Sequence, residues 1–286
     1  MNDRPLLKIA VPNKGSLSEA AQEMLREAGY RQRSDSKELV LTDVPNHVEF
    51  YYLRPRDIAV YVGEGTLDVG ITGRDMLLDS GAAAQEVMPL GFGATRFRYA
   101  APADHQWEIA ELEGKRIATS YPGLVKADLA KRGIEARLIK LDGAVESAIR
   151  LGVADAIADV VETGRTLRQA GMDVFGEPIL QSEAIMIKRE DTPSENGLAL
   201  LQRRLSGVLV ARNYVMMDYD CPEELVDRAS EVTPGLESPT VSPLAREGWV
   251  AVRAMVKRSV AQAVMDDLWE LGARAILVTD IAACRL

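Results

Sequence analysis

Through about its first 190 residues, the chain alternates short apolar runs with amphipathic stretches. The apolar run 6–11, for example, is followed by a Pro-Asn-Lys-Gly turn and then by a helical pattern that ends before Gly29. Alternation of this kind predicts an α/β fold with largely parallel sheets. The predicted strands are 6–11, 48–53, 67–71, 96–101, 116–119, 136–141, 156–161 and 184–188, with helices at 16–28, from 55, 74–80, 122–132, 144–151, from 164 and at about 195–211.

The order of these elements predicts two α/β lobes and a third domain. Residues 1–95 form lobe I, to which 182–211 return, and 96–181 form lobe II. Residues 212–286 change pattern and read as βαββαβ, the order of a ferredoxin-like domain. Such a domain either senses a small molecule or only mediates dimerisation, and the pattern leaves both open.

Histidine and cysteine are scarce, which excludes several classes of site. The chain has two histidines, His47 and His105, and two cysteines, Cys221 and Cys284, with no cluster among them. A structural zinc site needs four such ligands at short spacings, and a disulfide framework needs more cysteine in a smaller chain. Neither histidine lies in a nucleophile motif, so catalysis through imidazole is not expected.

The charge and hydropathy patterns limit partners and location. The net charge of −9 disfavours a nucleic-acid surface. No apolar run approaches the ~18 residues of a membrane span, and the N-terminal segment lacks a signal-peptide pattern. The protein is therefore expected to be cytoplasmic.

The most informative stretch lies between residues 141 and 167. A buried strand brings Asp159 toward its carboxyl end, and the turn Thr163-Gly164-Arg165-Thr166 follows and begins a helix. Backbone N–H groups and two hydroxyls in such a turn form an anion cradle, and glycine allows close approach of a phosphate. Carboxylates beside the cradle suit ribose hydroxyls, so the stretch predicts a ribose 5-phosphate pocket. In the alternative, Thr163 is an ordinary N-cap.

The same stretch resembles the signature of the ATP phosphoribosyltransferases, the first enzymes of histidine biosynthesis. Ten positions over 22 residues match the family pattern: Glu146, Gly152, Ala154, Ile157, Asp159, Val160, Thr163, Gly164, Thr166 and Leu167. Segments 11–15, 53–58 and 68–75 resemble lobe I motifs of the family. Segments 218–221 and 233–240 resemble the C-terminal domain of its long-form subfamily.

The resemblance implies a fold, a reaction and a set of site residues. The fold would be a two-lobed, type II periplasmic-binding-protein-like core with a C-terminal ferredoxin-like domain. The enzyme would transfer the phosphoribosyl group of phosphoribosyl pyrophosphate to N1 of ATP, with Mg²⁺ as cofactor and metal ligands unknown. The implied catalytic residues are Lys14, Arg54, Glu146 and Asp159; Glu146, Asp159, Thr163, Gly164, Arg165 and Thr166 would bind phosphoribosyl pyrophosphate, and Lys14, Arg54 and Asp75 would bind ATP.

Some of these roles have simpler alternatives. Lys14 could be a solvated lysine, and Arg74 with Asp75 an ordinary surface pair. Arg54 and Arg56 flank Pro55, and an arginine fork suits phosphate oxygens, but Arg56 could be a surface residue of a helical first turn. Because N1 of adenine already has a free lone pair, no residue is expected to be an indispensable general base.

Regulation and assembly also follow from the resemblance. Histidine would bind the C-terminal domain as feedback inhibitor, with Asp218, Ser238 and Thr240 supplying an anion and hydroxyls. In the alternative these three residues only cap turns. The family forms homo-oligomers, from dimer to hexamer.

Three other functions remain possible. The chain could be a non-catalytic two-lobed small-molecule binding protein, although it lacks a secretion signal. It could be a ligand-sensing regulator built on its C-terminal domain. It could also be a phosphoribosyltransferase for a different base, which the cradle alone does not distinguish.

Overall fold

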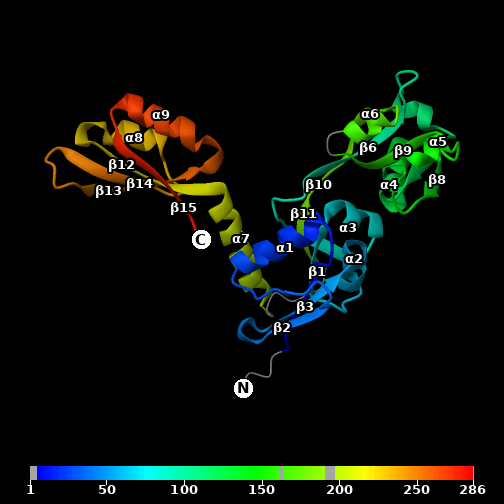
Figure 1. Cartoon of the computed structure of the whole chain (residues 1–286), viewed down its shortest axis with the longest axis horizontal. Helices are drawn as coiled ribbons and strands as arrows, with labels where there is room; N and C mark the ends of the chain where they lie inside the picture. Colours follow the sequence, from blue (N-terminus) through cyan, green and yellow to red (C-terminus); the bar gives the residue numbers. More distant parts are fainter. Residues whose placement is uncertain (1–4, 162–163, 191–196, 286) are drawn as a thin grey trace. The chain divides into compact units, whose positions relative to one another are not determined.

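The computed structural model describes residues 5–161, 164–190 and 197–285. The chain divides into two compact units (Figure 1). One unit is Met1–Arg26 with Tyr30–Ala199, and the other is Glu27–Gly29 with Leu200–Leu286. Most of helix α7 (Leu198–Asn213) falls in the second unit, and the domain boundary at residue 212 stays a prediction.

Lobe I is built on a six-stranded sheet with the order β2-β3-β1-β4-β11-β5. Its central strand β1 pairs in parallel with β3 and β4, while β11 runs antiparallel to both β4 and β5. The strands are β1 (Leu7–Pro12), β2 (Val40–Asp43), β3 (Val48–Leu53), β4 (Val69–Gly73), β5 (Ala84–Pro89) and β11 (Ala184–Arg189), and the helices are α1 (Ser16–Glu27), α2 (Pro55–Gly63) and α3 (Arg74–Ser80).

Lobe II is built on a five-stranded sheet with the order β10-β6-β9-β7-β8. One face packs against α4 through a core that includes Phe97, Ile117 and Leu129, and the other face buries Ile157 and Met172 beside α5 and α6. The strands are β6 (Thr95–Pro102), β7 (Arg116–Thr119), β8 (Arg137–Lys140), β9 (Ala156–Val161) and β10 (Met172–Ser182), and the helices are α4 (Pro122–Arg132), α5 (Ser147–Arg150) and α6 (Arg165–Gln169).

The two sheets share one strand arrangement. In each sheet, three parallel strands are followed by a strand antiparallel to the third, and then by an edge strand antiparallel to that one. In lobe I the order is β3-β1-β4, β11 and β5, and in lobe II it is β8-β7-β9, β6 and β10. The strands β6 and β11 follow the two connections between the lobes. This is the type II periplasmic-binding-protein-like arrangement that we expected. The expectation of largely parallel sheets is wrong, because the strands next to these connections are antiparallel in both sheets and β2 is antiparallel to β3.

Three strands were not predicted. The edge strands β2 and β5 mix polar and apolar residues and are half exposed, so neither shows the apolar run of a buried strand. The edge strand β10 contains Gly176 and Pro178, and its pairing with β6 shifts register between Phe175 and Leu180. Helix α5 is also shorter than the predicted 144–151.

The second unit contains the predicted βαββαβ domain. Its antiparallel sheet has the order β13-β14-β12-β15, which is the ferredoxin-like order. Helices α8 and α9 cover one face of this sheet (Figure 1), where Val215, Met217, Tyr219 and Cys221 are buried. The elements are β12 (Tyr214–Pro222), α8 (Val226–Val232), β13 (Thr240–Pro243), β14 (Trp249–Lys257), α9 (Ala261–Leu271) and β15 (Arg274–Asp280).

Across the described ranges, no helix combines the length and the apolar character needed to span a membrane.

Candidate functional site

The predicted phosphoribosyl turn joins β9 to α6. Thr163 lies outside the described residues. Gly164 adopts a left-handed backbone with φ of 68° and precedes the first residue of α6. That conformation disfavours any residue with a Cβ, which explains glycine at this position. Arg165 and Thr166 are exposed in the first turn of α6. Because α6 has only five residues, its dipole contributes little, and an anion here would be held by individual N–H groups.

Asp159 lies on β9 beside this turn, and other predicted site residues surround it. Its Oδ1 accepts the N–H of Val160 at 2.8 Å. Burial raises the pKa of Asp159, and nearby Glu146 and Asp75 raise it further, whereas the hydrogen bond from the Val160 N–H and the positive charge of Arg56 lower it. Three carboxylates predicted as site residues, from both lobes, are therefore close enough to interact electrostatically.

Asp75 is buried at the start of α3, with 5% of its surface exposed. Ser182, at the end of β10, donates to Asp75 Oδ1 at 2.8 Å and accepts the Asp75 N–H at 3.0 Å. The pKa of Tyr121 lies above its usual value because the ring is buried and because Asp75 adds negative charge nearby. Asp75 is thus not the surface residue of the simpler alternative; its carboxylate holds β10 against α3.

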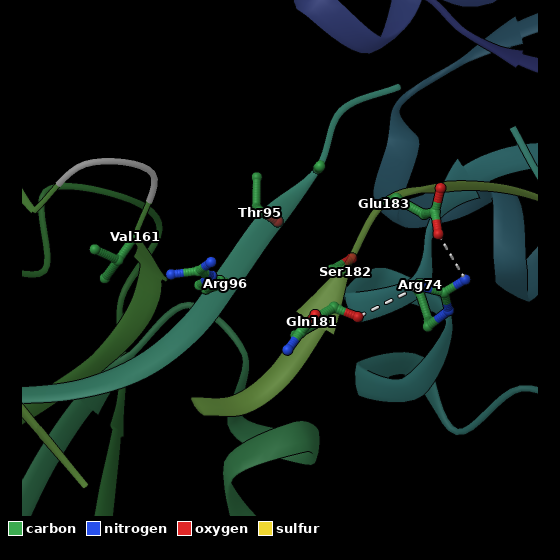
Figure 2. Close-up of a pocket in the computed structure, with 8 residues that line it drawn as sticks. Arg74, Thr95, Arg96, Val161, Gln181, Ser182 and Glu183 are labelled. Carbon is green, nitrogen blue, oxygen red and sulfur yellow. Dashed lines mark hydrogen bonds and ion pairs between the residues drawn. The ribbon is translucent and has the colours of Figure 1, made fainter. Parts of the chain in front are cut away.

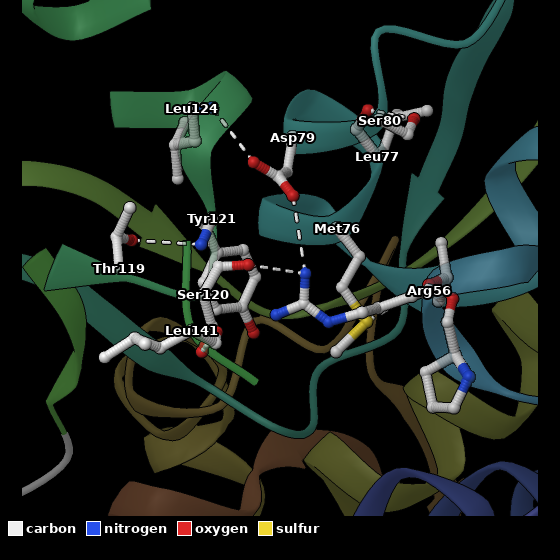
Figure 3. Close-up of polar contacts among 12 residues, drawn as sticks. Arg56, Met76, Leu77, Asp79, Ser80, Thr119, Ser120, Tyr121, Leu124 and Leu141 are labelled. Atoms are coloured by element: carbon white, nitrogen blue, oxygen red, sulfur yellow. Dashed lines mark hydrogen bonds and ion pairs between the residues drawn. The ribbon is translucent and has the colours of Figure 1, made fainter. Parts of the chain in front are cut away.

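Arg56, which belongs to lobe I, contacts residues of lobe II, and Arg54 does not (Figure 3). Its guanidinium lies 4.2 Å from the ring centroid of Tyr121, donates to the carbonyl of Ser120 at 2.7 Å and pairs with Asp79 at 3.4 Å. Asp79 Oδ1 in turn accepts the N–H of Leu124 at 3.1 Å. We call these five residues the lobe clasp. Arg54 is exposed, and its side chain forms no hydrogen bond or ion pair with the described residues.

Lys14 is exposed in the loop that follows β1. The buried Arg33 holds this loop from below, because its Nη2 donates to the carbonyl of Asn13 at 2.6 Å. The Arg33 guanidinium also stacks on Tyr52, at 4.1 Å from the ring centroid. The sequence interpretation missed Arg33, since nothing in its local pattern distinguishes it from a surface arginine.

A pocket of about 500 Å³ lies where the two connections run between the lobes (Figure 2). We call it the hinge pocket. Its charged groups are Arg74, Arg96 and Glu183, and Arg74 is held by Glu86, with two bonds of 2.8 Å, and by Glu183 at 3.3 Å. The pocket is lined by Arg74, Ala94, Thr95, Arg96, Val161, Gln181, Ser182 and Glu183.

The hinge pocket residues were not predicted as site residues. One available signal was the alternation Thr95-Arg96-Phe97-Arg98-Tyr99, which places two arginines on one face of an otherwise apolar strand. Arg98 lies opposite Asp159 on β9 and donates to the carbonyl of Gly176.

The three residues proposed for histidine binding lie around β12, β13 and β14. Asp218 accepts from Arg253 Nε at 2.6 Å. Thr240 pairs with Arg253 across β13 and β14, so Thr240, Arg253 and Asp218 form one cross-strand row on the face away from α8 and α9. Ser238 is exposed and donates to the carbonyl of Pro239 at 3.3 Å.

No group of three or more His, Cys, Asp or Glu side chains that could hold a metal is found in the part of the chain that the structure describes.

The fold defines a two-lobed protein. Its glycine turn, which lies beside half-buried carboxylates, and its hinge pocket, which contains arginines, suit a phosphorylated ligand. Comparison with known proteins identifies the family within this class. Residues 54–207 match the family model of HisG, ATP phosphoribosyltransferase, and residues 211–283 match that of the HisG C-terminal domain. The chain belongs to the ATP phosphoribosyltransferase family, in its long form.

Individual relatives cover nearly the whole chain. It is 63% identical to the ATP phosphoribosyltransferase of Arthrobacter sp. (strain FB24) and 62% identical to that of Streptomyces coelicolor, each over 98% of this chain and 100% of the relative. A solved ATP phosphoribosyl transferase (HisG:HisZ) complex from Thermotoga maritima matches with a TM-score of 0.62 at 25% identity, over 71% of this chain and 98% of that one.

Proposed function

We propose that the protein transfers the phosphoribosyl group of phosphoribosyl pyrophosphate to N1 of ATP, through Lys14, Arg54, Glu146, Asp159 and the turn 163–166. Family membership supports the reaction. The structural observation that carries the site is the position of Asp159: half-buried on β9, influenced by Glu146 and Asp75, and two residues before a strand end that leads into the Gly164 turn.

The proposed division of labour follows from the chemistry of each group. Carboxylates of Asp159 and Glu146 would orient the ribose hydroxyls and favour the positive charge that develops on the ribose ring. The N–H groups after Gly164, with the hydroxyl of Thr166, would hold the 5-phosphate. Lys14 and Arg54, both exposed after strands of lobe I, would contact the triphosphate of ATP.

The reaction needs no general base, because the attacking adenine nitrogen carries a free lone pair. Neither histidine lies within these groups: His47 follows β2 with a left-handed backbone, and His105 pairs with Asp104 and Glu111 on the surface of lobe II. Most of the acceleration would come from positioning two large anions and stabilising charge. Changing either histidine should leave the pH–rate profile unaltered.

Mg²⁺ is proposed as the cofactor. The described residues offer no three-ligand protein cage, and Mg²⁺ commonly binds through one or two carboxylates together with substrate phosphates and water. Asp159 and Glu146 fit the carboxylate part of such a set. When bound, the ion would neutralise charge on the leaving pyrophosphate.

Regulation and assembly are proposed on the same basis. Histidine would bind the C-terminal domain through Asp218, Ser238 and Thr240 and lower activity. The row formed by Thr240, Arg253 and Asp218 offers hydroxyl, cationic and anionic groups side by side, as an amino acid requires. The protein is proposed to act in the cytoplasm as a homo-oligomer, between dimer and hexamer.

The direct test is pyrophosphate release from a mixture of ATP and phosphoribosyl pyrophosphate with Mg²⁺, with and without histidine. Turnover that requires both substrates is the expected result. Binding of either substrate without turnover would instead indicate a two-lobed binding protein. Replacing ATP by other bases or nucleotides tests whether the protein is a phosphoribosyltransferase for a different base.

A further inference from the structure

The proposed function uses neither of the two arginines of the hinge pocket, Arg74 and Arg96. Strand pairing places Arg96 between Gln181 on β10 and Val161 on β9, and all three residues line the pocket. Directly paired residues share a face of the sheet, so their side chains point to the same side. Figure 2 shows the nitrogen atoms of Arg96 directed toward the end of β9 that carries Val161.

The other charged groups of the pocket are already paired. Glu183 accepts from Arg74 at 3.3 Å and from the N–H of Gly91 at 3.3 Å. Arg74 also makes its two bonds to Glu86. Arg96, by contrast, is exposed and forms no hydrogen bond or ion pair through its side chain with any residue that the structure describes.

A guanidinium that has no partner among the described residues, in a pocket of a protein with net charge −9, favours an anionic ligand. Asp159, proposed to contact ribose hydroxyls, lies two residues before Val161 on the same face of β9, and two residues along a strand span ~6.6 Å. The ribose of phosphoribosyl pyrophosphate carries phosphate groups at both C1 and C5. A cation at this distance from the ribose can therefore reach one of them.

We propose that Arg96 is a further substrate-binding residue, which contacts a phosphate group of phosphoribosyl pyrophosphate in the hinge pocket. This rests on the proposed function, because the ribose position is taken from the roles given to Asp159 and Glu146. Gln181, the partner of Arg96 on β10, lies beside it and can donate a neutral hydrogen bond to the same oxygen atoms.

The test compares R96Q with R96K and with the control R137Q. Arg137 is an exposed arginine on β8, at the opposite edge of the same sheet, so R137Q removes an equal charge away from the pocket. In R96Q, the KM for phosphoribosyl pyrophosphate should rise about 10- to 100-fold, as for loss of charge-assisted hydrogen bonds. The KM for ATP and the thermal midpoint should stay near wild type, because Arg96 is exposed. R96K should recover part of the loss.

Calorimetric binding of two probes identifies the phosphate group. Weaker binding of inorganic pyrophosphate alone places Arg96 at the leaving group, and weaker binding of ribose 5-phosphate alone places it at the 5-phosphate. An R96Q enzyme with unchanged KM for phosphoribosyl pyrophosphate and unchanged affinity for both probes overturns the proposal. If the wild type itself gave no turnover, the proposed function would fail, while the probe affinities would still decide whether Arg96 binds phosphate.

Discussion

Ser182 and Asp75, which are 107 positions apart in the chain, bond to each other twice: the serine hydroxyl accepts the Asp75 N–H at 3.0 Å and donates to its carboxylate at 2.8 Å. Both residues are buried, at 4% and 5% exposed. The pair attaches the last residue of β10 to the first turn of α3.

Replacing Ser182 by alanine should destabilise the first unit. Because a buried N–H and a buried carboxylate each lose a partner, we expect a cost of about 1–3 kcal/mol in the free energy of unfolding. Chemical denaturation measures it. Ser36→Ala is the control, since Ser36 is exposed, and its effect should stay within about 0.5 kcal/mol. Equal stability of both variants would contradict the structural role of the pair.

Arg56→Ala should loosen the lobe clasp. The change removes a cation–π contact with Tyr121 and a hydrogen bond to Ser120, together about 1–2 kcal/mol, which is about 5- to 30-fold in an equilibrium between joined and separated lobes. Hydrogen exchange at the amides of residues 120, 121 and 123–125 should accelerate accordingly. Arg54→Ala should leave this exchange unchanged, because Arg54 forms no such contact with the described residues. Similar acceleration in both variants would contradict the assignment.

Asp159→Asn should lower activity and raise stability at the same time. Burial raises the pKa of Asp159, so the folded state binds its proton more tightly than the unfolded state does. Above that pKa, the ionised carboxylate therefore costs stability, and asparagine removes the cost. The thermal midpoint of the variant should exceed that of wild type at pH 7, and the gap should close as the pH falls and wild-type Asp159 becomes protonated.

The activity of the same variant supplies the second half of this prediction. Its rate of pyrophosphate release should fall, since a neutral amide does not stabilise positive charge on the ribose. Asp142→Asn, at an exposed position, is the control for both measurements. A less stable or fully active D159N enzyme would count against the site.

Asp155→Asn should destabilise lobe II by about 1 kcal/mol at pH 7, as expected for a partly exposed ion pair. Arg116 donates to Asp155 from Nε, Nη2 and the backbone N–H, and its guanidinium lowers the pKa of Asp155 to about 2. For a lowered carboxyl pKa, the stabilisation is present above the ordinary value near 3.8 and is lost as the pH falls toward 2. Unfolding curves of both proteins should converge over that interval; a constant difference would argue against the ion pair.

Asp218→Asn should weaken inhibition by histidine. If Asp218 receives the ammonium group, loss of its charge should raise the inhibitory concentration about tenfold or more. Asp227→Asn, on the exposed side of α8, is the matched control. Deletion of residues 212–286 should abolish inhibition and leave part of the catalysis. A truncated chain that histidine still inhibits fully would refute the location.

Sequence signals predicted some elements to the residue and missed others. Strands β7 and β9 and helix α4 have the predicted bounds, because each combines an apolar run or helical pattern with residues that begin or end the element. For α4 these residues are Pro122 and Gly133. Strand β10 was not predicted because Gly176 and Pro178 interrupt its pattern. The register shift that accommodates these residues is part of the pairing of β10 with β6, which the local sequence does not show.

The site also contains residues that the sequence predicted and residues that it did not. The turn at Gly164 and the neighbouring Asp159 belong to one continuous segment whose spacing carries the family pattern. Of the two arginines around Pro55, the sequence favoured Arg54 as a contact for substrate phosphates, which stays a prediction, and it did not predict the contacts of Arg56 to Ser120 and Tyr121. Local spacing does not distinguish them, since the partners lie more than 60 residues away.

By itself, the sequence determined the alternation of strands and helices, the glycine turn with its acidic strand, and membership of a phosphoribosyl-transferring family, because each depends on residues close together in the chain. Only the tertiary structure decided that Ser182 holds Asp75, that Arg56 joins the lobes, and that Arg96 is left unpaired among the described residues that surround it. The residues involved lie far apart in the chain. The packing of the lobes, and for Arg96 the register of β6 with β9 and β10, decide which side chains meet, rather than any local periodicity.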